Sequence, residues 1–298
     1  MGILKLALIA TRLTRFITKR ILPSSLLSKA ALVALILIFI FMIIKYLISK
    51  RIKIYYKPTK LNTSTLEFLK SRLKKCKPTF YLPLPMLKMV TLTKSKQLKN
   101  KAIYVRESIK LRDGEVIGLD IHPKNHKEFD KNHPTIIFVP GLNGTSTNKH
   151  SSYICEMCEK DHSETKFRVG ILNKRGFGGM PILGKRLTNM DIYEDLIDVV
   201  KHVSKEFQTK NIYLIGFSLG SIHTLKALQS GRMDGLVKAA SLIGNPWKWK
   251  GVLAKLRKMP FIDNKLTRKH ISLLADHLHE PHFLRLMKEK EITEGNVF

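Results

Sequence analysis

The stretch IYLIGFSLGSIHTLKAL, residues 212–228, passes from an apolar run into an amphipathic run through Gly216-Phe217-Ser218-Leu219-Gly220. The first part has the composition of a buried strand, and in the second part Ile222, Leu225 and Leu228 recur at helical spacing. The two glycines have no Cβ, so they suit a turn that brings backbone close to backbone. The stretch therefore predicts a strand, a sharp turn at Ser218 and a helix.

A serine raised on such a turn suggests nucleophilic chemistry. The pattern G-x-S-x-G between a strand and a helix is typical of a nucleophile elbow, so Ser218 is the expected nucleophile. Its reaction would need hydrogen-bond donors for the developing oxyanion. The loop PGLNG, residues 140–144, follows the apolar run TIIFV, and we expect the backbone N–H groups of Leu219 and Leu142 to be these donors. The alternative for the loop is an ordinary turn between strand and helix.

Short apolar runs alternate with longer helical patterns from residue 103 onward. IYVRESI and EVIGLDIH predict a hairpin, and TIIFV, FRVGIL, IYLIG and VKAASLIG predict buried strands. Before the elbow, apolar residues keep a helical stripe: Ile192, Leu196, Val199, Val203 and Phe207. The alternation predicts an α/β protein with a mostly parallel sheet and flanking helices, and it places Ser218 at the carboxyl end of a central strand.

The N-terminal part has the pattern of a membrane anchor. Residues 30–44 carry no polar side chain, and Lys45 can extend its ammonium to the interface, so the usable stretch approaches the ~20 residues that a bilayer core requires. We therefore expect one transmembrane helix at residues 30–48. A cleaved signal peptide is the less favoured alternative, because basic residues 50–53 follow in place of a cleavage site. Leu6 excludes a myristoylation signal, which needs Ser or Thr there.

The chain is strongly basic, with 53 Lys and Arg against 23 Asp and Glu and a net charge of +30. This charge predicts an anionic partner. A basic connector at residues 49–101 is expected to lie beside anionic lipid, with a solvated linker as the alternative. Nucleic acid is disfavoured because the basic residues are scattered and carry no finger or RNA-binding signature.

The expected location is a membrane, but neither the organelle nor the orientation follows from the sequence. Residues 1–29 are basic, amphipathic and free of acidic residues, so a mitochondrial location is the alternative to the endoplasmic reticulum or another endomembrane. Five Lys and Arg stand in the twenty residues before Ala30 and six in the twenty from Lys45, which leaves the positive-inside rule undecided.

The string NKRGFGGMPI, residues 173–182, followed by an acidic helix and GFSLG, resembles the membrane-anchored α/β-hydrolase-domain family. That family is similar to bacterial YheT-type hydrolases and includes fungal medium-chain acyl-ethanol transferases and animal lipid-ester hydrolases. DGEVIGLDIHP, VPGLNGTSTNKHSSYI and AASLIGNPWKW match further blocks, over roughly residues 65–298. The resemblance implies an α/β-hydrolase domain at residues 102–298 and a membrane-bound serine esterase or lipase, with acyltransferase activity as a further expectation.

Two departures from the family concern its chemistry. Pro140-Gly141 stands where the family often has His-Gly. Neither the late "DDP"-like run that carries the family's acid nor its final "GGH" occurs in the 80 residues after Ser218, so the triad acid and base stay unknown. The resemblance places cap helices at about residues 250–290 and implies that the last strands are missing, as in a partial sequence, a short isoform or a pseudoenzyme.

The expected activity is therefore hydrolysis of lipid or medium-chain carboxylic esters through Ser218. The alternative is a catalytically inactive α/β-hydrolase-like membrane protein that binds lipid or a partner. No cofactor and no metal are expected, since Cys155 and Cys158 lie on a predicted helix and match no standard zinc spacing.

Overall fold

The computed structural model describes residues 26–47, 53–72, 102–160, 167–183 and 193–248, together with Gly251 and Lys258. The chain divides into two compact units, residues 1–96 and 97–298. The predicted basic N-terminus lies largely outside the described residues, as do the predicted cap helices.

The first unit contains two described helices, α2 (Leu26–Leu47) and α3 (Lys60–Arg72). The 22-residue helix α2 covers most of the transmembrane segment expected at residues 30–48. Within the described residues, however, no helix combines the length and the apolar character needed to cross a membrane, so the expected anchor is not supported.

Helix α3 lies within the predicted basic connector at residues 49–101, whose position beside lipid stays a prediction. Pro58 stands just ahead of the helix, where a proline removes no intrahelical hydrogen bond. Thr59 caps the helix: its Oγ1 accepts a hydrogen bond from the Asn62 N–H at 3.2 Å. The proline and the cap together account for the start of α3 at Lys60.

The second unit is built on a six-stranded sheet of order β1-β2-β4-β3-β5-β6. The strands are β1 (Val105–Lys110), β2 (Val116–His122), β3 (Thr135–Val139), β4 (Arg168–Asn173), β5 (Ile212–Phe217) and β6 (Val237–Ile243). Strands β1 and β2 form the predicted hairpin and β2 pairs antiparallel with β4, whereas the pairs β4–β3, β3–β5 and β5–β6 are parallel. The mostly parallel sheet expected from the sequence is confirmed.

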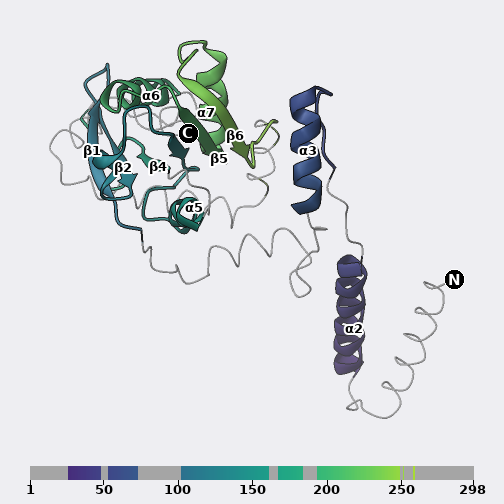
Figure 1. Cartoon of the computed structure of the whole chain (residues 1–298). Coiled ribbons are helices and arrows are strands. Elements are labelled where there is room, and N and C mark those ends of the chain that lie inside the picture. Colours follow the sequence, from purple (N-terminus) through teal and green to yellow (C-terminus); the bar gives the residue numbers. More distant parts are fainter. Residues whose placement is uncertain are drawn as a thin grey trace. The chain divides into compact units, whose positions relative to one another are not determined.

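Helices cover both faces of this sheet (Figure 1). Helices α6 (Glu194–Glu206) and α7 (Leu219–Gln229) contribute to one apolar cluster, and α5 (Lys149–Lys160) contributes Cys155 to a second cluster with Phe138, Val169 and Ile171. The predicted stripe on α6 is confirmed at Leu196, Val199 and Val203, which are buried. The result is a three-layer α/β unit in which the carboxyl ends of β3, β4 and β5 meet at one edge.

Candidate active site

Ser218 stands on the predicted turn between β5 and α7. Its backbone has φ 54 and ψ −116, a conformation that non-glycine residues rarely adopt and that stores strain. The neighbouring strand holds this conformation, because the Ser218 N–H donates to the carbonyl of Ile243 on β6 at 2.9 Å. The Ser221 hydroxyl, which also contacts Asn245 Oδ1 at 2.9 Å, donates to the Ser218 carbonyl at 2.5 Å. Hydrogen bonds thus fix both the backbone N–H and the backbone carbonyl of the strained serine.

The two glycines of the turn permit close backbone approach, as their position in the sequence predicts. A Cβ on Gly216 would lie 2.6 Å from Ser221 Cα. A Cβ on Gly220 would lie 2.6 Å from the Pro140 carbonyl oxygen and still closer to that of Val139. The start of α7 therefore packs directly on the end of β3.

Gly220→Ala is expected to destabilise the domain by about 2–3 kcal/mol, because the new methyl group meets backbone atoms that have no space to retreat. Urea unfolding of the purified chain measures the change. Gly251→Ala is the matched control, since a Cβ there meets nothing within 4 Å, and it should change the free energy of unfolding by less than about 0.5 kcal/mol. Equal losses in the two variants would contradict this account of Gly220.

The loop after β3 lies against the nucleophile. A Cβ on Gly141 would lie 3.3 Å from Ser218 Cβ, so the backbone of residues 140–144 passes beside the serine side chain. Leu219, the other predicted oxyanion donor, is the first residue of α7, and helix geometry leaves its N–H without an intrahelical acceptor. The structure thus brings the loop of Leu142 and the N-terminus of α7 beside the same serine, and both donor roles stay predictions.

Two consecutive residues at the end of β4 hold this loop in place. Asn173 Oδ1 accepts a hydrogen bond from the Ser146 N–H at 2.9 Å, and Asn173 Nδ2 donates to Asp120 at 2.9 Å. The next residue, Lys174, donates through Nζ to the carbonyl of Leu142 at 2.8 Å and to the carbonyl of Gly141. Burial lowers the pKa of the Lys174 ammonium to about 7.

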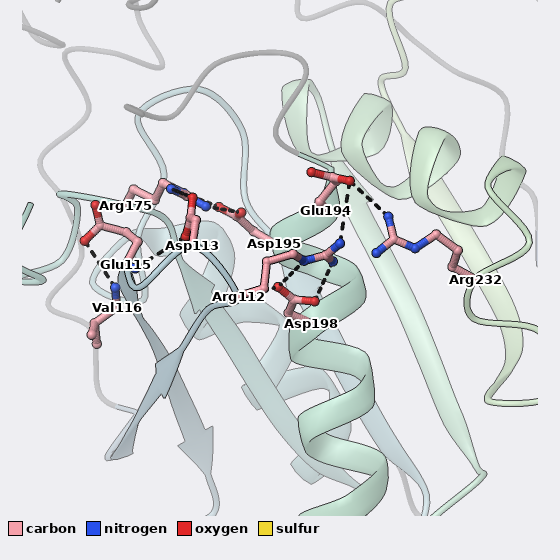
Figure 2. Close-up of polar contacts among 9 residues, drawn as sticks. All are labelled: Arg112, Asp113, Glu115, Val116, Arg175, Glu194, Asp195, Asp198 and Arg232. Carbon is pink, nitrogen blue, oxygen red and sulfur yellow. Dashed lines mark hydrogen bonds and ion pairs between the residues drawn. The ribbon is translucent and has the colours of Figure 1, made fainter. Parts of the chain in front are cut away.

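An ionic cluster at the same edge joins three separate segments (Figure 2). Arg175, from the loop after β4, donates from Nε and Nη2 to both carboxylate oxygens of Asp195 on α6, at 2.8 and 2.7 Å. Its Nη1 donates to Asp113 of the β1–β2 turn at 2.6 Å. The turn is also tied to α6 by Arg112, which pairs with Asp198 at 2.6 Å. The motif NKRGFGG therefore supplies three consecutive side chains that fix the surroundings of the site.

The described residues contain no complete triad. His223 on α7 is buried and lines a cavity of about 10 Å³ with Lys174 and Asp195, which has room for about one water molecule. Asp234 is exposed after α7. The other Asp and His residues after Ser218 lie outside the described residues: Asp263, Asp276, His270, His277, His279 and His282.

Sequence reasoning missed several residues of the site. Lys174 and Arg175 lie inside the motif that carries the family resemblance, and Asn245 lies inside AASLIGNPWKW, so these residues stood in recognised motifs but had no assigned role.

Cys155 is buried and its thiol pKa is raised by burial to about 12. No group of three or more His, Cys, Asp and Glu side chains in the described part of the chain could hold a metal ion.

Comparison of the chain with known proteins identifies its family. Residues 130–297 match the Hydrolase_4 family, described as serine aminopeptidase, S33. The chain is 31% identical over 142 residues to phospholipase ABHD3 of Mus musculus, covering 46% of this chain and 34% of that protein. It is 31% identical over 122 residues to embryogenesis-associated protein EMB8 of Picea glauca, covering 39% of this chain and 26% of that protein.

Solved structures also resemble part of the chain. The structure of the DcsB complex with its substrate analogue has a TM-score of 0.40 and 24% identity, over 52% of each chain. An esterase from Exiguobacterium antarcticum has a TM-score of 0.35 and 19% identity, over 48% of this chain and 46% of the esterase.

The chain spans about a third or less of the length of the curated relatives that it matches, as the coverages of 34% and 26% illustrate. The family match extends over more than half of the chain itself and includes the elbow, β6 and the segment that follows. By that match the chain belongs to the Hydrolase_4 family and so to the α/β hydrolases.

Proposed function

We propose that this chain is part of a membrane-associated serine hydrolase that cleaves lipid or medium-chain carboxylic esters through Ser218. The observation that carries the proposal is the strained serine itself, held at φ 54 with the backbone of Gly141 packed against its Cβ. Strain of this kind persists where the surrounding structure enforces it, and it clusters at functional sites. Few structural roles need a serine rather than a glycine at such a position.

In the proposed reaction, Ser218 Oγ attacks the ester carbonyl while a base takes the hydroxyl proton. The carbonyl oxygen becomes an oxyanion that accepts hydrogen bonds from the N–H groups of Leu219 and Leu142. Collapse of this intermediate breaks the ester C–O bond, the alcohol leaves with the proton, and the acyl group stays on Ser218 until water or a second alcohol removes it. An alcohol acceptor would make the same site an acyltransferase. The acid and base of the triad have no assignment.

The substrate class and the location are the finer parts of the proposal. A lipid ester is supported by the relatives named phospholipase ABHD3. Association with a membrane is supported by α2, on which large apolar side chains are exposed: Leu35, Leu37, Ile38, Phe39, Phe41 and Ile44. An endomembrane is the proposed location, with a mitochondrial membrane as the alternative.

The test is covalent labelling of the full chain, purified in detergent, with a fluorophosphonate probe. We expect mass spectrometry to find one phosphonyl adduct, on the peptide that contains Ser218, because only an activated serine reacts quickly with this electrophile. Ser108→Ala removes an exposed serine on β1 and should leave labelling unchanged. A folded protein that takes no label would overturn the proposal and favour the non-catalytic lipid-binding or partner-binding alternative.

A further inference from the structure

Lys174 is a deeply buried basic side chain at the candidate site. It follows β4 directly and is only 4% exposed, although lysine is almost never fully buried unless it is paired. Among the described residues no carboxylate lies within ion-pair distance of its ammonium, and Asp195, which lines the same cavity, is engaged by Arg175. A buried ammonium without a counter-ion needs another reason to be there.

The partners of the ammonium are backbone carbonyls of the loop beside Ser218. Nζ donates to the carbonyl of Leu142 at 2.8 Å and to that of Gly141, and it lies 5.7 Å from the centre of the Phe177 ring. The remaining face of the ammonium thus meets an aromatic ring, which can stabilise a cation. The two carbonyls accept hydrogen bonds from the ammonium and the ring attracts its charge, so these contacts favour the protonated form, whereas burial opposes it.

The geometry of the peptide group connects these contacts to catalysis. In a trans peptide the C=O of one residue and the N–H of the next lie in one plane and point in opposite directions. A donor that fixes the Gly141 carbonyl therefore also fixes the direction of the Leu142 N–H, the predicted oxyanion donor. No described residue accepts a hydrogen bond from that N–H, so it is left available for a ligand.

We propose that Lys174 is a positioning residue that orients the Leu142 N–H toward the oxyanion through its hydrogen bonds to the Gly141 and Leu142 carbonyls. The inference rests on the proposed function, because it assigns Lys174 a task within the same reaction. Lys174 does not touch the reacting atoms itself. Its effect is to remove the rotational freedom of two peptide planes before the substrate arrives, which is how preorganised donors stabilise developing charge.

The first experiment compares the rate of Ser218 labelling by a fluorophosphonate in the wild-type chain and in Lys174→Met. Loss of one well-aligned oxyanion donor typically costs about 10²–10³-fold in rate. We expect the limiting labelling rate to fall at least 30-fold, while the probe concentration at half-maximal rate changes less than about three-fold, because the donor acts on the transition state rather than on probe binding. Lys201→Met, at an exposed position on α6, should change neither quantity.

The second experiment measures the loop directly and does not depend on catalysis. The Gly144 N–H is bonded to the Gly141 carbonyl at 3.1 Å and the Ser146 N–H to Asn173 at 2.9 Å, so both amides report on loop order. In Lys174→Met we expect hydrogen exchange in residues 141–146 to accelerate at least ten-fold, with β3 and β5 unchanged. The thermal midpoint of the variant should change little. The loss of two hydrogen bonds destabilises the fold, but the removal of a buried charge relieves a desolvation cost of similar size.

The outcomes separate the two proposals. A wild-type chain that takes no label overturns the proposed function, and with it the catalytic purpose of Lys174, whereas the exchange rates still decide whether Lys174 orders the loop. A labelled wild type with an unchanged rate or unchanged loop exchange in Lys174→Met overturns the positioning role. Lys174→Gln keeps a neutral donor and should recover part of both losses, so it serves as the second variant if Lys174→Met does not fold.

Discussion

Ser218→Ala is expected to lower turnover of p-nitrophenyl octanoate by at least 10³-fold. The reason is that the covalent route needs the Oγ atom, and the residual catalysis of an empty oxyanion site is small compared with the complete reaction. Steady-state hydrolysis by the full chain measures the effect. Turnover that persists in Ser218→Ala at the wild-type rate would remove Ser218 from the mechanism.

Stability measurements on position 218 give an independent check. Alanine at φ 54 is as strained as serine, so Ser218→Ala should unfold at nearly the wild-type urea concentration. Ser218→Gly relieves the strain, since glycine adopts positive φ readily, and it should be more stable than Ser218→Ala by about 1 kcal/mol. A glycine variant that is inactive but more stable would show that the fold tolerates strain at this position for the sake of the hydroxyl.

Most of the sheet was predictable because its strands are short apolar runs separated by longer helical patterns. The predicted runs 135–139, 167–172 and 212–216 fall on β3, β4 and β5, and the predicted hairpin of IYVRESI and EVIGLDIH is formed by β1 and β2. The elbow was predictable for a local reason, since strand, turn and helix are contiguous in sequence. Such features depend on neighbours within a few residues.

The parts that sequence reasoning missed depend on distant partners. Lys174 contacts carbonyls about thirty residues earlier in the chain, and a lysine gives no sequence signal of which backbone it will meet. The buried side of α7 is another case. Ile222, Leu225 and Leu228 predicted the helix correctly, yet they are only half-buried, whereas Gly220, Thr224 and Ala227 are buried. At Gly220 the reason is that α7 approaches the end of β3 too closely for a larger side chain.

Arg175→Met is expected to destabilise the domain by about 3–5 kcal/mol, the largest stability loss among these variants. Arg175 is buried, and its bidentate contact with Asp195 satisfies a carboxylate that is itself only 7% exposed. Burial alone would lower the pKa of Arg175, but the hydrogen bonds that it donates to Asp195 and Asp113 raise this pKa above its ordinary value. Removal of the guanidinium leaves the Asp195 carboxylate without a partner in the domain interior, which is the costly case for a buried pair.

The neighbouring pair in the same cluster provides the control (Figure 2). Arg112 forms a similar contact with Asp198 at 2.6 Å, but its side chain is 42% exposed, and solvated pairs contribute little. Arg112→Met should therefore cost less than about 1 kcal/mol by urea unfolding.

A double variant separates the loss of attraction from the penalty of an orphaned charge. Arg175→Met combined with Asp195→Leu removes both charges and fills the same space with apolar groups, so it should recover to within about 1–2 kcal/mol of the wild type. Recovery would mean that the Arg175–Asp195 pair contributes little net free energy of folding. Its main effect would then be to specify how the loop after β4 meets α6. A double variant as unstable as Arg175→Met alone would contradict this, and would show that the guanidinium stabilises the domain through Asp113 and its packing rather than by neutralising Asp195.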